Sequence, residues 1–367
     1  MELLEKSDCH IKPFIKWAGG KDKELKILQS FYPKFYLRYV EPFVGGGSVF
    51  FNTLCQQYVI NDKSEELINL YKMIESQNEL FFQYLNKIAS SWKYMEVIAV
   101  KYKNDLLNLY NDDCSIGIDV FISKISQECV KLIVSDGFTD GLLLNEIKKN
   151  LASKIKRAKK IEMQKDKMPD NEILANMECA LKSSFYMYIR YLYNSMSIKD
   201  FPSLYAAVFY FIREYCYSSM FRYNSDGKFN VPYGGISYNK KDLFSKIEYL
   251  HSEKIVSKLQ KTSIYCEDFE KFLEALKLNE KDFIFLDPPY DTEFSTYAKN
   301  IFDKKDQIRL AEYLKKTKAK FLLVIKETDF IRSLYSEFNI FSFDKHYLVS
   351  FKNRNKKDVT HLIITNY

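Results

Sequence analysis

The sequence predicts an α/β protein built on a Rossmann-like, mostly parallel sheet. Short apolar runs that favour strands alternate with helical segments in residues 1–75 and 241–367, which is the pattern of a parallel sheet covered by helices. Residues 76–240 carry few strand signals until their end, and this predicts a largely helical insert. The 367 residues therefore divide into a sheet domain, 1–75 with 241–367, and an inserted domain, 76–240.

Each expected strand is a short apolar run bounded by polar residues or turn formers. In the first block a helix around 23–28 precedes a strand ending near Glu41 and a second strand ending at Asp62. In the second block the expected strands are 263–266, 283–286, 321–325, 340–343 and 362–365. The helices expected between and after them lie near 269–278, 304–316 and 331–338.

The octet 283–290 reads Phe-Ile-Phe-Leu-Asp-Pro-Pro-Tyr and predicts a functional turn at the end of a buried strand. The two prolines limit the turn's freedom and supply no backbone N–H to compete for nearby acceptors. Asp287 and an outward carbonyl can both accept hydrogen bonds from one planar amino group. Tyr290 follows at once and can stack on the heterocycle that carries this group. The tetrapeptide 287–290 is therefore a candidate site for chemistry on such a nitrogen.

A glycine loop, 45–47, joins the strand ending near Glu41 to an apolar stretch that begins at Ser48 and can be helical. Glycines let the backbone approach a ligand closely, and a helix start offers N–H groups to an anion. About 20 residues on, Asp62 lies at the usual distance of the acid that holds a ribose hydroxyl pair in doubly wound folds. Gly-Gly-Gly-Ser does not match the G-x-G-x-x-G fingerprint of dinucleotide sites.

Four motifs in a fixed order give the chain a family resemblance. They are Lys-Trp-Ala-Gly-Gly-Lys (16–21), Glu-Pro-Phe-Val-Gly-Gly-Gly-Ser (41–48), Phe-Asn-Val-Pro-Tyr-Gly (229–234) and Asp-Pro-Pro-Tyr (287–290). Together they resemble the Dam-type adenine-N6 DNA methyltransferases of the alpha group, in which the cofactor motif precedes the catalytic one. The resemblance covers 11–75 and 205–367 and is not visible over most of 76–204.

The resemblance implies a site that uses S-adenosylmethionine as methyl donor and needs no metal. It implies that Asp287 and the Pro288 carbonyl accept the two hydrogens of adenine N6, and that Tyr290 stacks on an adenine flipped out of the duplex. The catalytic residues are then Asp287, Pro288, Pro289 and Tyr290. The cofactor contacts fall on Trp17, Lys21, Phe43, Gly45, Asp62 and Asp287. Asp268 is a candidate for the cofactor's adenine amino group, although an acid at a strand end is otherwise unremarkable.

Residues 221–233 predict a β-hairpin that turns at Asp226 and Gly227. Its Arg222 and Asn224 suit a DNA groove, because an arginine fork pairs with guanine O6 and N7. The resemblance implies that this hairpin reads double-stranded DNA, with contacts at Lys16, Tyr217 and Arg222. This chain has Tyr-Ser-Ser-Met at 217–220, where the family often has Tyr-Asn-Gly-Leu. A surface hairpin with ordinary polar residues is the alternative interpretation.

Composition fits an intracellular enzyme with a polyanionic partner. The net charge is +7, a mild basic bias. Seven cysteines are scattered singly without a C-x-x-C pair, so neither a disulfide framework nor a zinc site is expected. The N-terminus lacks the features of a signal peptide, and the most apolar run, 206–212, is too short to span a bilayer. We expect a cytoplasmic protein, monomeric in solution and without membrane contact.

Two charged segments allow both a structural and a functional interpretation. The lysine-rich run 148–167 is either a solvated helix face or linker, or a set of phosphate contacts along DNA. The polar loop 350–357 is either a surface loop or, by the resemblance, a cover over the target-base pocket.

Other functions remain compatible with parts of the sequence. A methyltransferase with the same tetrapeptide could act on RNA or on a protein glutamine, although neither enzyme needs the upstream motif or the hairpin. A nucleotide-dependent oxidoreductase is disfavoured by the missing fingerprint, and a non-enzymatic DNA-binding protein would not need Asp287. The target sequence is open, with GATC compatible with Lys16 and Arg222. The chain acts either alone or beside a restriction endonuclease.

Overall fold

The computed structural model describes residues 10–111, 115–132, 140–164, 166–289, 302–346 and 358–367. The chain forms two units, 1–76 with 252–367 and 77–251. The second unit ends later than the expected boundary at 240/241, because α10 (Leu243–Leu250) packs against α4 (Glu79–Lys101). Two predicted features, Tyr290 and the polar loop 350–357, lie outside the described residues.

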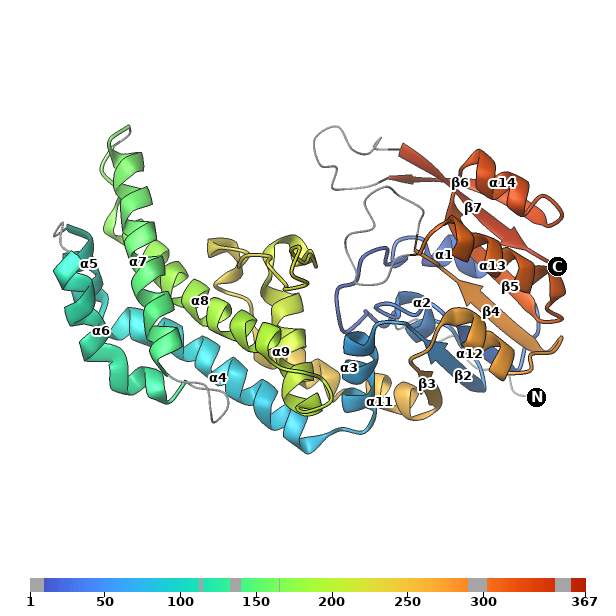
Figure 1. Ribbon diagram of the computed structural model, residues 1–367, viewed down its shortest axis with the longest axis horizontal. Coiled ribbons are helices and arrows are strands. Elements are labelled where there is room, and N and C mark those ends of the chain that lie inside the picture. The colour runs from blue at the N-terminus through green and yellow to red at the C-terminus, as the bar shows by residue number, and fades with distance from the viewer. Residues whose placement is uncertain (1–9, 112–114, 133–139, 165, 290–301, 347–357) are drawn as a thin grey trace. The chain divides into compact units, whose positions relative to one another are not determined.

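The first unit is built on a seven-stranded sheet in the order β3-β2-β1-β4-β5-β7-β6 (Figure 1). Strands β1 to β5 are parallel, and β7 is antiparallel to both β5 and β6. At the centre of the sheet, Val40 of β1 pairs with Val59 of β2 and with Ile284 of β4. The predicted Rossmann-like, mostly parallel α/β fold is therefore confirmed. The strands are β1 Arg38–Glu41, β2 Gln57–Asn61, β3 Thr262–Tyr265, β4 Asp282–Leu286, β5 Lys320–Lys326, β6 Asn339–His346 and β7 Asp358–Thr365.

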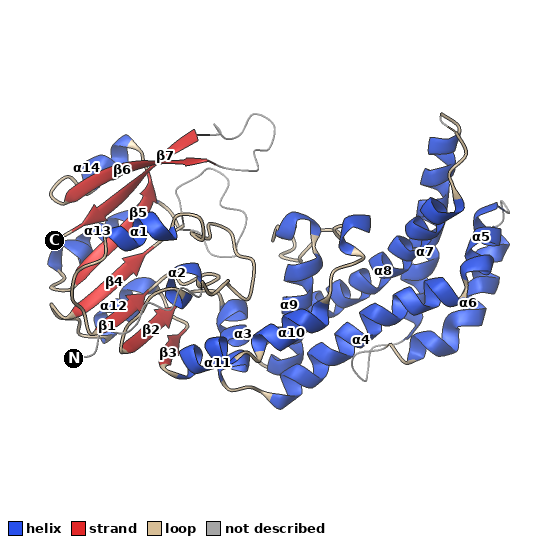
Figure 2. Ribbon diagram, turned by 180° about the vertical axis from the view of Figure 1, so that it is seen from behind, coloured by secondary structure: helices blue, strands red, loops and turns tan. Residues whose placement is uncertain are grey.

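Strand β4 forms because its alternating apolar side chains fill both faces of the sheet. On one face, Ile284 and Leu286 enter a core with three helices, namely α12 Phe269–Ala275, α13 Lys304–Lys316 and α14 Asp329–Leu334. On the other face, the Phe283 ring lies 4.9 Å from the Tyr32 ring, which follows α1 (Leu25–Ser30). Figures 1 and 2 show α12 and α13 on one side of the sheet and α1 on the other. Burial on both faces is typical of parallel sheets.

The strand order places a topological switch point between β1 and β4. From β1 the chain moves outward to β2 and β3, and it then returns to β4 on the other side of β1. Ligands of open α/β sheets bind outside the carboxyl ends of the strands at such a point. Glu41 ends β1 there, and Asp287 follows β4 there. The fold thus brings the glycine loop and the Asp-Pro-Pro segment to the same edge of the sheet.

The helix expected after the glycine loop is only one turn long, α2 (Ser48–Phe51). The Asn52 side chain ends it, because its Nδ2 donates to the Ser48 carbonyl at 2.9 Å and to the Ile11 carbonyl at 2.8 Å. So short a helix supplies no strong site for an anion. The helices α3 (Glu65–Glu75) and α11 (Glu253–Gln260) pack together and complete the first unit.

The second unit is largely helical, as predicted. Helix α9 (Pro202–Tyr215) is buried from Ser203 to Tyr215 and packs against α4 and α8 (Asp170–Ser195). The Trp92 ring of α4 lies 4.5 Å from the Tyr215 ring of α9. The other elements are α5 Lys103–Asn111, α6 Ser115–Val130, α7 Asp140–Glu162, η1 Tyr217–Ser219 and η2 Ile236–Tyr238. A β-hairpin follows α9, with Cys216 opposite Tyr233 and Tyr223 opposite Phe229.

Candidate active site

Lys21 and Asp287 form an ion pair at the switch point, although 266 residues separate them in the sequence. The Lys21 ammonium donates to Asp287 Oδ2 and to the Gly19 carbonyl at 2.8 Å. The backbone N–H of Lys21 donates to Ser48 Oγ at 3.0 Å, so the lysine is fixed at both ends. Lys21 is 1% exposed and Asp287 is 18% exposed. The pair therefore presents its carboxylate, and not its ammonium, to solvent.

The glycine loop contacts Asp62 and Trp17, two residues of the predicted cofactor site. The Gly45 N–H donates to Asp62 Oδ2 at 3.0 Å, and the Ser64 N–H donates to Oδ1 at 2.9 Å. A Cβ atom on Gly45, whose φ is +49°, would lie 2.8 Å from Trp17 Cδ1. Only glycine permits this approach. Burial raises the pKa of Asp62, and the N–H groups of Ser64 and Gly45 oppose that rise.

The carboxyl ends of β2 and β3 are tied together through the residues that precede Asp62 and Asp268. Asn61 Nδ2 donates to the Glu267 carbonyl at 3.0 Å, and the Glu267 N–H donates back to Asn61 Oδ1 at 2.9 Å. Asn61 Nδ2 also donates to the Pro42 carbonyl at 3.1 Å, which fixes the start of the glycine loop. These bonds hold Asp62 and Asp268 at adjacent strand ends.

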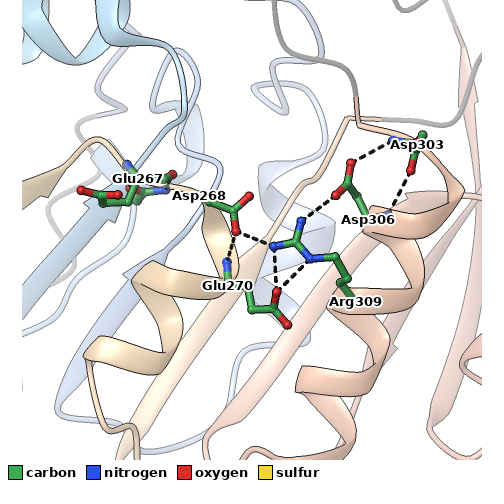
Figure 3. A network of polar contacts seen from close by, with 7 residues as sticks. Glu267, Asp268, Glu270, Asp303, Asp306 and Arg309 are labelled. Atoms are coloured by element: carbon green, nitrogen blue, oxygen red, sulfur yellow. Dashed lines mark hydrogen bonds and ion pairs between the residues drawn. The ribbon is translucent and has the colours of Figure 1, made fainter.

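Asp268 is the N-terminal cap of α12 and the partner of an arginine (Figure 3). Its Oδ1 accepts from the Glu270 N–H at 3.1 Å and from Arg309 Nη2 at 2.7 Å. Burial opposes ionisation of Asp268, but the hydrogen bonds from Arg309 and Glu270 outweigh it and lower the pKa. Phe43 lies beside this point, with its ring 5.5 Å from the Phe269 ring.

Buried Glu41 at the end of β1 and half-buried Lys258 of α11 add two ionisable groups to this unit. Glu41 is 2% exposed and accepts a hydrogen bond from the Tyr39 hydroxyl at 2.6 Å. Burial raises the pKa of Glu41 well above its usual range, and nearby Asp287 adds to the rise. Burial lowers the pKa of Lys258 to about 7, and its ammonium donates to the Thr53 carbonyl. Burial and the neighbouring Asp287 carboxylate thus both disfavour ionisation of Glu41.

The two prolines of the tetrapeptide take different positions. Pro288 is buried, whereas Pro289 is exposed and its carbonyl accepts a hydrogen bond from Gln307 Nε2 at 3.3 Å. Gln307 lies fully buried in α13. A hydrogen bond from α13 thus fixes the segment that follows Asp287. Tyr290, predicted to stack on the base, lies outside the described residues.

The hairpin of the second unit is fixed through its backbone. Asn224 Oδ1 accepts from the N–H groups of Asp226 at 3.1 Å and Lys228 at 2.8 Å, and Gly227 has a φ of +69°. Asn194 of α8 pairs with both backbone groups of Phe229, at 2.9 and 3.0 Å. Asn224, predicted to contact DNA, therefore shapes the turn with its amide oxygen.

The other predicted DNA contacts are exposed side chains. Tyr217 is 49% exposed, and Arg222 is exposed with its Nε 3.4 Å from Asn230 Oδ1. Lys16 belongs to the first unit and is also exposed. Ser218 and Ser219 both have positive φ, at 52° and 51°, which is rare outside glycine and asparagine. Asn and Gly, which the resembled family often has at 218 and 219, would adopt this conformation with less strain than two serines.

Comparison with known proteins decides the family. The D12 class N6 adenine-specific DNA methyltransferase profile matches residues 17–99 and 120–348. The chain belongs to this family. The predicted resemblance is therefore confirmed, and the chain is a DNA adenine-N6 methyltransferase.

Similar proteins match along nearly their whole length. The Type II methyltransferase M.CviBI of Paramecium bursaria Chlorella virus NC1A is 27% identical over 365 residues, covering 97% of this chain and 100% of the viral protein. The Type II methyltransferase M.MjaIII of Methanocaldococcus jannaschii is 29% identical, with 97% and 99% covered. The DNA adenine methylase of Vibrio cholerae is 24% identical, with 95% and 94% covered.

Membership of this family implies a methyl donor of the S-adenosylmethionine type, and the switch point has the chemistry to hold it. Carboxylates at the ends of β2, β3 and β4 can accept from hydroxyl, amino and ammonium groups, all of which that cofactor carries. Among the described residues, no group of three or more His, Cys, Asp or Glu is placed to hold a metal ion. No helix in the described ranges is long and apolar enough to cross a membrane.

Sequence reasoning missed Glu41, Gln307 and Arg309. Glu41 could have been predicted from the sequence, because it is a carboxylate at the end of a strand, next to the glycine loop. Gln307 and Arg309 could not, because their partners Pro289 and Asp268 lie 18 and 41 residues away. Only the fold brings α13 to those two segments.

Proposed function

We propose that this enzyme transfers the methyl group of S-adenosylmethionine to N6 of an adenine flipped out of duplex DNA, within a specific sequence. One observation carries the proposal: a partly exposed carboxylate, Asp287, stands at the carboxyl end of β4 with its charge compensated by buried Lys21. Because the carboxylate is fixed before substrate arrives, no reorganisation is needed when charge develops on the nitrogen.

The chain's own residues act on the target nitrogen by accepting hydrogen bonds. Adenine N6 is a poor nucleophile because its lone pair is delocalised into the ring. Asp287 and the Pro288 carbonyl accept its two hydrogens, and this favours a pyramidal nitrogen with its lone pair directed at the methyl donor. The Gln307 bond to Pro289 limits rotation of the segment that carries both acceptors.

The cofactor is proposed to lie along the carboxyl ends of β2, β3 and β4. When bound, S-adenosylmethionine supplies the methyl group from its sulfonium. Asp62 accepts from the ribose hydroxyl pair, and Asp268 accepts from the adenine amino group. Trp17, Lys21, Phe43 and Gly45 line this edge, where Gly45 and Trp17 lie in contact.

Sequence reading is assigned to the second unit, by way of the hairpin. Arg222 is proposed to contact a guanine, and Tyr217 or Ser218 to lie where a side chain wedges into the base stack, with Lys16 of the first unit as a further guanine contact. GATC is the proposed target. The enzyme acts either alone or beside a restriction endonuclease. The names of the relatives support both, since two are Type II methyltransferases and one is a DNA adenine methylase.

Methylation by the purified enzyme tests this function directly. The protein is incubated with labelled S-adenosylmethionine and equal amounts of duplex DNA, single-stranded DNA, RNA and a protein mixture, and the modified positions are sequenced. We expect N6-methyladenine in one short motif of the duplex. Label in RNA or protein but not in duplex DNA would overturn the proposal. A motif other than GATC would correct only the target.

A further inference from the structure

Arg309 of α13 binds three carboxylates at once (Figure 3). Its Nη2 lies 2.7 Å from both Asp268 Oδ1 and Glu270 Oε2, and its Nε donates to Glu270 Oε2 at 2.8 Å. Its Nη1 donates to Asp306 Oδ1 at 2.7 Å. These short, charge-assisted bonds fix the guanidinium in one orientation.

The network leaves one oxygen of Asp268 for a ligand. Oδ1 is occupied by Arg309 and by the Glu270 N–H, whereas Oδ2 makes no hydrogen bond within the part of the chain that the structure describes. In Figure 3 this second oxygen points away from Arg309 and Glu270. Asp268 thus presents an acceptor in a fixed direction at the carboxyl end of β3.

Phe269, the residue after Asp268, belongs to a group of three aromatic rings. The Phe269 ring lies 5.5 Å from the Phe43 ring and 5.6 Å from the Phe302 ring. The Arg309 guanidinium lies 4.9 Å from the Phe269 ring centroid. A flat heterocycle that packs against aromatic rings and donates from an amino group has the chemistry of adenine.

We propose that Arg309 is a positioning residue for the adenine of the cofactor: it holds Asp268 so that Oδ2 accepts the adenine amino group. The inference rests on the proposed use of S-adenosylmethionine. Lysine could not replace Arg309, because a single ammonium cannot hold three carboxylates in a planar fork. Without the guanidinium, Asp268, Glu270 and Asp306 would repel one another, and Asp268 would lose its fixed direction.

The test compares two ligands that differ only in the group Asp268 is proposed to read. One is S-adenosylhomocysteine, and the other is its analogue with hydrogen in place of the 6-amino group. Calorimetry on the wild-type protein should show roughly 10- to 100-fold tighter binding of the amino form, as expected for one hydrogen bond to a charged group. In Arg309→Met, which keeps the stem near Phe269, this ratio should fall towards one.

Two further variants separate positioning from general damage. Glu270→Gln keeps the Arg309–Asp268 contact and should keep most of the ratio. Arg309→Lys should lower the ratio nearly as far as Arg309→Met, and it preserves the charge if the methionine variant folds poorly. A ratio near the wild-type value in both Arg309 variants would overturn the proposal. A wild-type ratio of one would overturn it as well, while methylation of duplex DNA by the same protein would leave the proposed function intact.

Discussion

At the carboxyl ends of β2, β3 and β4, each proposed functional carboxylate already holds a partner within the first unit. Asp62 accepts two backbone N–H groups, Asp268 binds Arg309, and Asp287 binds Lys21. Along the hairpin, by contrast, hydrogen bonds fix the backbone while the side chains proposed to read DNA are exposed. The Arg222 guanidinium, for example, makes a long 3.4 Å contact with Asn230.

This difference shows that methyl transfer and recognition of the DNA sequence make different physical demands on the protein. Charge that develops on a nitrogen is stabilised best by groups that need no reorganisation, so the catalytic edge is fixed in advance. A reader must meet base edges whose hydrogen-bonding groups differ between sequences, so a fixed backbone with exposed side chains serves it. Substitutions in the first region should therefore act on all DNA alike, and substitutions in the second should act on particular bases.

The largest effect is expected for Asp287→Asn. The amide keeps the shape of the side chain but replaces one acceptor with a donor, which would face the amino group of adenine. The single-turnover methylation rate should fall by roughly 10²- to 10³-fold or more on every duplex, by analogy with the loss of one transition-state contact. DNA affinity, measured by fluorescence anisotropy, should stay unchanged. Near-normal turnover would remove Asp287 from the mechanism.

Asparagine is preferred to alanine at this position because Lys21 is almost fully buried. Removing one partner of a buried ion pair costs about 3–5 kcal/mol. Thermal unfolding of Asp287→Asn and Asp287→Ala therefore serves as the control. The alanine variant should be the less stable of the two, so its loss of activity would be harder to interpret.

A second test concerns the stability of the first region against pH. The pKa of Lys258 is about 7 in the folded protein, well below its value of about 10.4 in unfolded chains. Between these values the unfolded chain binds more protons, so this group makes the folded state more stable as pH rises from 7 to 10, by up to about 1.4 kcal/mol per pH unit. Lys258→Met removes the dependence. The free energy of unfolding of the variant should therefore exceed that of wild type by most near pH 7 and by least near pH 9.

Chemical denaturation at pH 7, 8 and 9 measures this difference. The chain has two tryptophans, so a Trp92→Phe background lets Trp17 report on the first unit alone. If stability changes with pH in the same way in the wild-type protein and in Lys258→Met, then Lys258 is not a weakly basic amine.

Asp62→Asn should act on the cofactor and not on the chemistry. Losing one or two charge-assisted hydrogen bonds should weaken S-adenosylhomocysteine binding by about 1–3 kcal/mol. Calorimetry measures this affinity. The matched control is Glu253→Gln, which changes an exposed acid of α11 in the same unit. Cofactor affinity equal to that of the control would remove Asp62 from the site.

Arg222→Ala should change which duplexes are methylated. The loss should be about 1–3 kcal/mol at one guanine, with relaxed specificity there. The control is the pair Lys156→Gln and Lys160→Gln, exposed on α7, where phosphate contacts would weaken all duplexes alike and flatten the salt dependence. A uniform loss for Arg222→Ala would make it a backbone contact.

The smallest effect is expected at the strained backbone before the hairpin. Ser219 has a φ of 51°, a conformation that glycine adopts without penalty. Ser219→Gly should stabilise the second unit by a few tenths to about 1 kcal/mol, read from Trp92 fluorescence during denaturation. Ser225→Gly, in the turn but without a positive φ, should instead be neutral or destabilising. The opposite order would show that the strain at Ser219 is relieved elsewhere.

Local patterns predicted the sheet because each strand is defined by its own residues. The run 283–286 is apolar at every position and lies within β4, which is buried on both faces. The segment 321–325 likewise lies within β5. The helical stretch expected from Ser48 is the single turn α2, and no local pattern indicates how short it is, because the Asn52 side chain at its end is bound to the Ile11 carbonyl, 41 residues earlier.

Site residues were predictable where they belong to a local sequence pattern. They were not predictable where only the packing of distant segments brings them to the site. Asp62, Asp268 and Asp287 were identified because each follows a strand. Their partners were harder to find. Nothing near Arg309 in the sequence indicates that it reaches Asp268, since the contact depends on how α12 and α13 pack.

One panel of duplexes, each differing from the methylated sequence at a single base pair, distinguishes the roles of Asp287 and Arg222 most directly. Single-turnover methylation rates are measured on the panel for wild type, Asp287→Asn and Arg222→Ala. We predict that Asp287→Asn lowers every rate by the same factor and preserves their ranking, whereas Arg222→Ala changes the ranking at one base pair. A changed ranking for Asp287→Asn, or a uniform factor for Arg222→Ala, would contradict the separation of fixed chemistry from adaptable reading.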